Sequence, residues 1–505
     1  MKKFSKSYVY YHLVVDFIII FFIMLCFTTE MFLDSEEEFD FLTHLPEIIT
    51  VFLVLFVIAY ALKTLYSILY LNASGYQLKE NEIECKRGVL FKKRSILDYK
   101  KIHAVNKKQN LIHKIFKLAV LTLDSGSTNT AYASEILIIE KENVVDEIVA
   151  VLKSKQSGET VSVEKPIEEK ENLYKFTAKS RFIYSALNVL STLLVLIVAS
   201  LIAVVLFAVA LPLITKNANG WETIGIILVA LYSLIIYLII LLAVFVISIL
   251  VSFLSYYKFR IFKNTDDVEI NYGFFVKNNN TFKLNKIKGV IITQGLIKRL
   301  FGFVTVKVEV IGYNEVNSKE NSSSTTGILF PLCKKSEVCE NIKKVLPNFV
   351  PDQKQIGAKK YFPFISWKLL IFSIVAVSSF LITLFDLIYF NIQTDIILTV
   401  VRTFIGVYLI TVTFILIGGL LAYKNNGISV NKDKITVYNG AFTKNQAVIK
   451  IKEIISIEDV TTPLRKRLGI YSGVIHFKSN AETNEVRINN VDESIIEKLK
   501  EIIKY

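Results

Sequence analysis

The chain of 505 residues has little of what enzymes and metal proteins use for chemistry. Its four cysteines form no C-x-x-C pair and no framework spacing, which argues against a disulfide scaffold and a zinc site and favours reduced thiols. Its five histidines include no H-E-x-x-H arrangement. The motifs G-x-x-x-x-G-K-S/T, G-x-G-x-x-G and G-x-S-x-G are absent too, so nothing indicates a nucleotide loop or a nucleophilic serine. We therefore expect a protein that is not an enzyme and that has no cofactor and no metal site.

Long apolar runs dominate the sequence instead. Hydrophobic residues make up 52% of the chain and the mean hydropathy is +0.46, which is too apolar for an ordinary soluble protein. A helix crosses a bilayer with about 20 mostly apolar residues. Runs of suitable length lie at residues 13–29, 48–71, 182–214, 224–257, 369–385 and 396–423. They predict six membrane spans, arranged as three helical hairpins.

The distribution of charge predicts the orientation of these spans. Lysines precede the first run, whereas the loop after it carries seven carboxylates and no lysine or arginine. Those carboxylates are Glu30, Asp34, Glu36, Glu37, Glu38, Asp40 and Glu47. By the positive-inside rule we expect a multi-pass protein of the bacterial cell membrane with both termini and all polar segments in the cytoplasm. Glu36, Glu37 and Glu38 are then candidates for an outer acidic site; the alternative is a solvated loop that helps to orient the spans.

Each hairpin is followed by a polar module of roughly eighty residues, and the three modules align without gaps. One constant shift along the chain carries the first module onto the second, and another carries the second onto the third. The repeated positions are Ile83, Gly88, Ile102 and Leu111; Val268, Gly273, Ile287 and Leu296; and Ile435, Gly440 and Ile454, with Pro463 in place of the leucine. The predicted hairpins span 1–71, 182–257 and 367–423, the modules 72–155, 258–347 and 424–505, and the linkers 156–181 and 348–366.

Within the modules, apolar and polar residues alternate as in half-buried strands, for example at 119–123, 304–310 and 434–438. The repeated glycine lies between two such runs, where a tight turn would use a positive φ. Each module then ends in an apolar stripe with helical spacing. The stripes are Val145, Ile148 and Leu152; Val338, Ile342 and Val345; and Ile495, Leu499 and Ile502. The pattern predicts small α+β modules, each a β-barrel or sandwich with a C-terminal helix.

A short segment of each module resembles a known family. After a K-I step, the second module reads L-I-K-R-L-F-G at 296–302. The residues that carry the match are Lys286, Ile287, Gln294, Leu296, Arg299, Leu300, Phe301 and Gly302, with weaker counterparts at Lys101, Ile102, Gln109, Leu111, Ile115 and Phe116, and at Ile454, Arg467, Leu468 and Gly469. With the triple layout, the chain resembles the membrane-flanked bacterial pleckstrin-homology-like (PH-like) proteins of the YdbS/YdbT type, in the triple-module YdbT-like form. The outer copies depart from it: Lys117 stands where Gly302 sits, and the third lacks Gln and Phe.

The resemblance implies three PH-like barrels and a role in the cell envelope. Some members of the family look like protection factors against membrane-active bacteriocins, so the resemblance suggests envelope stress and bacteriocin immunity by analogy. It also implies lipid contact by a basic first hairpin, as PH domains bind acidic headgroups. In the first module the candidate residues are Lys86, Arg87, Lys92, Lys93 and Arg94, which bracket Gly88. The corresponding stretches 276–280 and 443–446 are far less charged. A solvated face near an anionic membrane is the alternative interpretation.

Two charges within apolar runs are further candidates. Asp16 lies in the first span and Arg402 in the sixth, and intramembrane charges are costly enough to suggest function. Alternatively, Asp16 meets the N-terminal lysines and Arg402 snorkels outward. The leading hypothesis is a non-enzymatic membrane protein that displays three cytoplasmic PH-like binding modules in envelope defence against antimicrobial peptides. The alternative is an accessory subunit of a transport or export system, although only Pro212 and Gly418–Gly419 offer the broken helices it would use.

The expected partners are the lipid bilayer and a membrane protein, such as a shorter sibling with a single hairpin. The net charge of +14 lies mainly beside apolar segments, which favours a membrane over nucleic acid. The sequence leaves the ligand of the modules and the oligomeric state open.

Overall fold

The computed structural model describes residues 1–33, 41–125, 136–157, 171–215, 220–264, 266–310, 326–359, 367–389, 394–477 and 484–504. They form two compact units. The first contains Met1–Lys175 and Lys258–Lys286, and the second contains Phe176–Tyr257, Ile287–Val310 and Asn321–Tyr505. The division passes through the second module, so a compact unit of this chain is not the same as a module.

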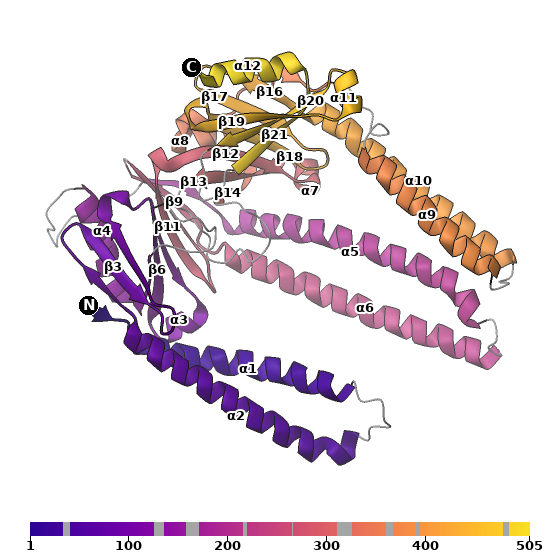
Figure 1. Ribbon diagram of the computed structural model, residues 1–505, viewed down its shortest axis with the longest axis horizontal. Helices are drawn as coiled ribbons and strands as arrows, with labels where there is room; N and C mark the ends of the chain where they lie inside the picture. Colours follow the sequence, from indigo (N-terminus) through magenta and orange to yellow (C-terminus); the bar gives the residue numbers. More distant parts are fainter. Residues whose placement is uncertain are drawn as a thin grey trace. The chain divides into compact units, whose positions relative to one another are not determined.

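In the described parts of the chain, six long helices form three pairs (Figure 1). They are α1 (Ser7–Leu33) with α2 (Phe41–Ala73), α5 (Ala178–Thr215) with α6 (Gly220–Ser255), and α9 (Trp367–Tyr389) with α10 (Thr394–Asn425). By length and composition, four windows could cross a membrane: Ser7–Met24, Ile49–Ala73, Ile227–Ser255 and Val400–Asn425. A shorter apolar helix covers Ile371–Phe385. The described residues therefore support several membrane-spanning helices.

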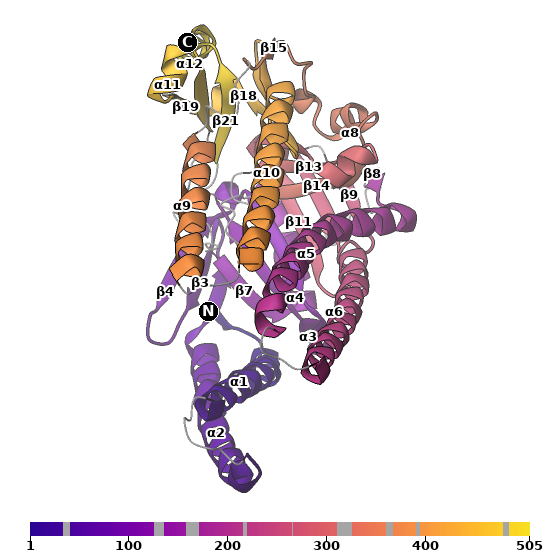
Figure 2. The same ribbon diagram turned by 90° about the vertical axis from the view of Figure 1, so that its right-hand side faces the viewer.

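Specific side chains hold two of these pairs together. Between α1 and α2, the ring of Phe17 meets that of Phe56 edge-on at 5.2 Å, and the Tyr60 hydroxyl donates to the Leu13 carbonyl at 3.1 Å. α9 and α10 run side by side (Figure 2), with the rings of Phe380 and Phe404 stacked at 4.0 Å. Aromatic pairs of this kind add to apolar burial and fix the rotation of one helix against the other.

A short strand precedes each helix pair and joins the sheet that follows it. β1 (Lys2–Lys3) pairs with β2 (Gly75–Leu78), β8 (Glu171–Lys175) with β9 (Arg260–Lys263), and β15 (Ile356–Gly357) with β16 (Gly427–Val430). The chain therefore enters each helix pair from one strand and leaves it into the neighbouring strand of the same sheet.

Each module contributes two sets of three strands. The first sets are β2, β3 (Glu82–Arg87) and β4 (Lys93–Asp98); β9, β10 (Asp267–Tyr272) and β11 (Lys277–Lys283); and β16, β17 (Lys434–Asn439) and β18 (Lys444–Lys450). The second sets are β5 (Ala104–Gln109), β6 (Leu118–Asp124) and β7 (Ile136–Lys141); β12 (Ile287–Gln294), β13 (Phe303–Val310) and β14 (Thr326–Lys334); and β19 (Ile454–Val460), β20 (Tyr471–Phe477) and β21 (Asn484–Val491). The predicted strands at 119–123, 304–310 and 434–438 are confirmed as β6, β13 and β17, and their ladders are antiparallel.

The second strand set of one module continues into the first set of the next. One seven-stranded antiparallel sheet has the order β7-β6-β5-β11-β10-β9-β8, and the other has the order β14-β13-β12-β18-β17-β16-β15. β5 thus pairs with β11, and β12 with β18. The sequence analysis predicted the modules but not this joining. Each compact unit is built around one of these shared sheets.

The repeated isoleucines belong to the core. Ile102, Ile287 and Ile454 are 1%, 0% and 8% exposed. In the first module, Ile102 packs with strand residues from both sets and with the C-terminal helix α4 (Glu142–Ser157). A short helix follows the fourth strand of every module, namely α3 (Leu111–Ile115), α7 (Leu296–Leu300) and α11 (Pro463–Arg467).

The predicted helical stripes are right in two modules and shifted in the third. All three residues are buried in α4 and in α8 (Val338–Val345). In α12 (Glu493–Lys504), Leu499 is buried, Ile495 packs half-buried against the same core, and Ile502 is 36% exposed. The second fully buried residue is Ile496, which lies three residues before Leu499.

Candidate functional site

The basic hairpin of the first module is formed by β3 and β4. Gly88 ends the first strand with φ +103°, and a Cβ there would lie 2.1 Å from the Phe91 carbonyl oxygen. The position therefore needs glycine, which confirms the predicted turn. The ladder sets Lys86 opposite Arg94 and Arg87 opposite Lys93, so the hairpin does gather the predicted cations. Lys92 lies just before the return strand, which begins at Lys93, and is exposed.

A carboxylate that the sequence analysis missed balances part of this charge. Glu84 is only 4% exposed, and its oxygens lie 2.7 Å from Arg94 Nε, 3.3 Å from Lys79 Nζ and 3.7 Å from Lys86 Nζ. Hydrogen bonding to Arg94 outweighs burial and lowers the pKa of Glu84. Only the ladder register could have revealed this, because Glu84 and Arg94 are ten residues apart. The cations left facing outward are mainly Lys92 and Lys93.

The tip of this hairpin (residues 89–91) is apolar. Leu90 is 83% exposed and Phe91 is 92% exposed. Two large apolar side chains beside exposed lysines have the chemistry of a membrane-surface contact, since the lysines suit lipid phosphates and the apolar side chains suit the acyl boundary. The corresponding tips are contacted: the Phe274 carbonyl accepts a bond from Lys114 at 2.5 Å, and Phe442 stacks on Phe414 of α10 at 4.5 Å.

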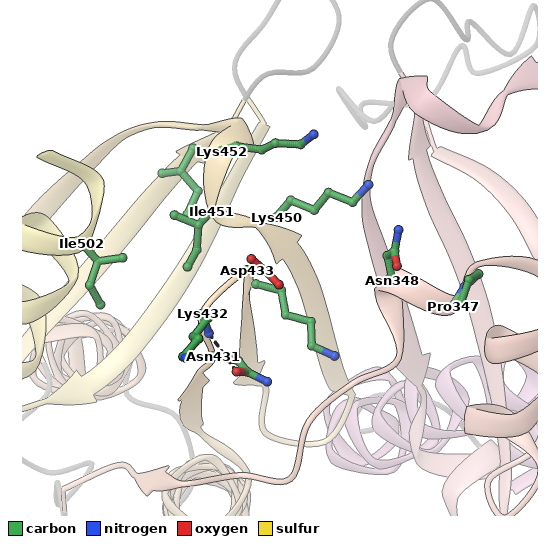
Figure 3. A pocket seen from close by; sticks show the side chains of 11 residues that line it. Pro347, Asn348, Asn431, Lys432, Asp433, Lys450, Ile451, Lys452 and Ile502 are labelled. Carbon is green, nitrogen blue, oxygen red and sulfur yellow. Dashed lines mark hydrogen bonds between the residues drawn. The ribbon is translucent and has the colours of Figure 1, made fainter. Parts of the chain in front are cut away.

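A second basic surface lies in the third module. A cavity of about 790 Å³ is lined by the lysines Lys432, Lys434, Lys450 and Lys452, among other residues (Figure 3). Lys434 and Lys450 stand opposite each other on β17 and β18, where like charges repel. The sequence analysis did not single out this cluster, because its lysines come from two strands that only the ladder brings together.

Two of these lysines already interact with a neighbouring side chain. Lys434 Nζ lies 3.2 Å from Asp352 Oδ1, and Lys450 Nζ lies 4.5 Å above the Phe349 ring. Burial lowers the pKa of Lys450, and the nearby Lys452 lowers it further. Lys432 and Lys452 remain exposed. The cavity could therefore attract a small anion, but with fewer available charges than its lining suggests.

The turn around each short helix explains the glutamine of the family motif. Gln109 donates from Nε2 to the carbonyl nine residues later at 2.9 Å, and Gln294 makes the same bond at 3.0 Å. In the third module Thr461 replaces the glutamine, and its hydroxyl still reaches the carbonyl nine residues on at 3.0 Å. Lys117 also adopts a positive φ of +51°, close to the +72° of Gly302. These departures from the motif therefore keep the turn.

Two of the short helices place a basic side chain, buried in one case and half-buried in the other, against a tyrosine at the foot of a helix pair. In the first module His113 stacks on Tyr11 at 4.3 Å, and burial lowers the pKa of His113 to about 4. In the second, Lys298 lies 4.9 Å over the Tyr184 ring and donates to the Thr305 hydroxyl at 2.8 Å. Burial lowers the pKa of Lys298 to about 8. Both contacts connect the short helix of a module to the helix pair that precedes that module.

The remaining sequence candidates do not assemble into one site. Asp16 is 8% exposed, and its carboxylate lies 3.3 Å from His12 Nδ1, one turn earlier on α1. Arg402 lies on α10 with an exposed side chain. Glu36, Glu37 and Glu38 lie outside the described residues. Among those that are described, no group of three or more His, Cys, Asp and Glu side chains could hold a metal ion.

Comparison with known proteins agrees with this architecture. Residues 30–155, 186–343 and 373–505 each match the family described as "Bacterial PH domain". Over 431 residues the chain is 23% identical to the UPF0699 transmembrane protein YdbT of Bacillus subtilis (strain 168), covering 83% of this chain and 82% of that protein. The three matches span most of the chain, and each includes a module together with apolar helix. The chain therefore belongs to the bacterial PH domain family, as a YdbT-like membrane protein with three PH-like modules.

Proposed function

We propose that this protein is a non-enzymatic scaffold of the bacterial cell membrane, with six spans and with both termini and all three modules in the cytoplasm. Its first module contacts anionic lipid through the β3–β4 hairpin. The observation that carries this is the tip, where Leu90 and Phe91 are 83% and 92% exposed between cations. The lysines near the spans support the orientation. The six long helices, paired as three hairpins, support the number of spans.

The physiological role that we propose is defence of the envelope against cationic membrane-active peptides. It rests on the absence of catalytic motifs in the sequence, on the family, and on the seven carboxylates of the first loop, which would face outward. Deletion of the gene should sensitise cells to such peptides while leaving growth otherwise near normal. Unchanged sensitivity, with loss of export of some substrate, would favour a transport role instead.

Lipid contact can be measured on the full-length protein in nanodiscs. Phe91→Trp, in a background with Trp221 and Trp367 replaced by Phe, should be quenched by brominated lipid more strongly when the disc contains anionic phosphatidylglycerol. Replacing Lys92 and Lys93 with Gln should weaken this preference by about tenfold or more, because each lysine near an anionic surface contributes about 1 kcal/mol.

The matched control removes two lysines from the other basic surface. Lys432→Gln with Lys452→Gln lowers the net charge equally but leaves the hairpin intact, so quenching at position 91 should not change. Equal quenching in neutral and anionic discs would refute lipid recognition by the hairpin. Orientation is tested separately: Ser35→Cys should be labelled from outside in intact cells, whereas Ser157→Cys and Ser318→Cys should need permeabilisation.

A further inference from the structure

The two joints between modules follow one rule. β5 pairs with β11 so that Gln109 stands opposite Lys277, and β12 pairs with β18 so that Gln294 stands opposite Lys444. In the alignment of the repeats, Gln294 occupies the position of Gln109, and Lys444 occupies the position of Lys277. The register is therefore identical. In each joint the fourth strand of one module pairs with the third strand of the next.

This rule leaves one strand over at each end of the series. β4 is the third strand of the first module and β19 is the fourth strand of the third. In the described residues β4 pairs with β3 alone and β19 with β20 alone. Ile96 on β4 is 49% exposed, whereas its counterpart Val448 in the joined strand β18 is 0% exposed. An open strand edge with apolar side chains is a template for an added strand.

The register of the two joints defines how these edges would meet. It sets Lys93 opposite Val460, Arg94 opposite Asp459, and Ile96 opposite Ile457. In an antiparallel ladder, directly opposed and diagonal side chains interact, and opposite charges stabilise the pairing. Glu458 would stand diagonally from Lys93. The two open edges are thus complementary in charge.

This complementarity is confined to the open edges. The joined third strands carry Asn278 and Asn445 where β4 carries Lys93. The joined fourth strands carry Lys107 and Ile292 where β19 carries Asp459. The cations of β4 and the carboxylates of β19 therefore stand at positions where the joined strands carry neutral residues or a lysine. In the described structure these two strands are also the ones whose second edge has no partner strand.

The charges already have neighbours inside their own modules. Arg94 Nε lies 2.7 Å from Glu84, Glu458 lies 3.4 Å from His476 Nε2, and Asp459 pairs with Lys500. A docked strand would therefore add a second opposite charge to Arg94 and to Asp459, rather than a first. The tip of the first module would lie near the partner's short helix, as Phe274 does near Lys114. Phe274 keeps 43% exposure there, so docking leaves the tip able to meet lipid.

We propose that copies of this chain associate head to tail, with β19 of one copy pairing with β4 of the next in the register of the internal joints. Both edges belong to the same chain, and the carboxylates of one match the cations of the other, which favours a second copy as the partner. A head-to-tail contact is heterologous, so each copy keeps one edge for a further neighbour and the series closes into a ring or extends. Insertion of all copies in one membrane raises their effective concentration.

The test is disulfide crosslinking of the full-length protein in native membranes. The exposed Cys26 and Cys339 are replaced by Ser, and the buried Cys85 and Cys333 stay. One tagged copy carries Lys93→Cys and a differently tagged copy carries Val460→Cys, both at exposed positions. Oxidation should give a dimer that contains both tags. In the control, the second copy carries Ser456→Cys in place of Val460→Cys, so that the two cysteines lie four residues out of register. The yield of the crosslinked dimer should then fall about tenfold or more.

Charge reversal distinguishes this joint from accidental collision. Asp459→Lys in the Val460→Cys copy should lower the yield about tenfold, as should Arg94→Glu in the Lys93→Cys copy, and the two together should restore it. Glu485→Lys, on another strand of the third module, should change nothing. The proposal is overturned if no interchain product forms, if one chain carrying both cysteines crosslinks only within itself, if only a shorter single-module protein is captured, or if charge reversal has no effect.

Discussion

The joint between the second and third modules makes a quantitative prediction. Lys288 on β12 and Glu453, which ends the turn η5 (Ile451–Glu453), approach to 2.7 Å with side chains only 12% and 13% exposed. Exposed ion pairs contribute about 0–1 kcal/mol, whereas removing one partner of a buried pair costs about 3–5 kcal/mol. Because this pair lies between the two limits, we expect Glu453→Gln to cost about 2 kcal/mol.

Most of that cost would come from the lysine left without its partner. Replacing both residues, as Lys288→Met with Glu453→Leu, should therefore recover all but about 1 kcal/mol. The assay is hydrogen exchange of the full-length protein in detergent, read at the β12 and β18 amides that form the joint. A loss of about 2 kcal/mol corresponds to roughly 30-fold faster exchange there.

The matched control is the exposed pair Arg487–Glu485, whose side chains are 64% and 48% exposed. Glu485→Gln should change the hydrogen-exchange rate of the β12 and β18 amides by less than about twofold. If Glu453→Gln leaves the β12 and β18 amides as protected as before, the ion pair does not stabilise the joint. If the double replacement is as damaging as the single one, the cost is lost attraction and not an unpaired lysine.

Three further predictions concern the modules. Ile287→Asp should unfold the second module at a cost of several kcal/mol, because Ile287 is 0% exposed. Ile287→Val should cost only about 1 kcal/mol, and a folded, fully active Asp variant would contradict the core placement. Gly88→Ala should cost about 2 kcal/mol or more, while Gly295→Ala, with no atom within 4 Å of its Cβ, should stay within a few tenths in the same thermal unfolding assay. His113 has a pKa near 4 in the folded protein, so between about pH 6.5 and pH 4 the unfolded chain binds one proton more. The stability of the first module should therefore fall as the pH falls, by up to about 1.4 kcal/mol per pH unit, and His113→Gln should flatten that slope.

The sequence predicted the local features that depend on nearest neighbours and on periodicity. The turn glycine was predicted at position 88 because two alternating runs flank it, and φ +103° confirms the reason. Alternation identified β13, and helical spacing identified α8. In α12 the stripe missed Ile496 because Ile495 and Ile496 are adjacent, and spacing alone does not say which of them is buried more deeply. Tertiary packing decides such a choice.

The hairpin gathers the cations that the sequence placed on it, but the ion pairs of Glu84 were not predicted. The three cationic neighbours of Glu84 depend on the ladder between β3 and β4. The lysine cavity of the third module was missed for the same reason, since Lys434 and Lys450 face each other only in the folded sheet. Charge patterns along the chain do not reveal cross-strand neighbours that lie far apart in the sequence.

The joints between modules have a signal in the sequence that the sequence alone did not explain. The stretches 276–280 and 443–446 carry far less charge than the basic hairpin. The structure gives a physical cause for the first of these stretches. Asn279 and Asn278 on β11 stand opposite Lys107 and Lys108 on β5. Cations at those positions would oppose like charges across a ladder.

The strand that kept its cations is the opposite case. β4 has no such neighbour in the described structure, so Lys93 and Arg94 can meet an edge that carries carboxylates or a surface that carries phosphates. β19 offers the first and an anionic membrane the second. The two are separable, because Asp459→Lys alters only the strand edge, while removing phosphatidylglycerol alters only the lipid. A module series that loses its crosslinks with Asp459→Lys but keeps lipid quenching at position 91 would show that the edge and the tip of one hairpin serve different partners.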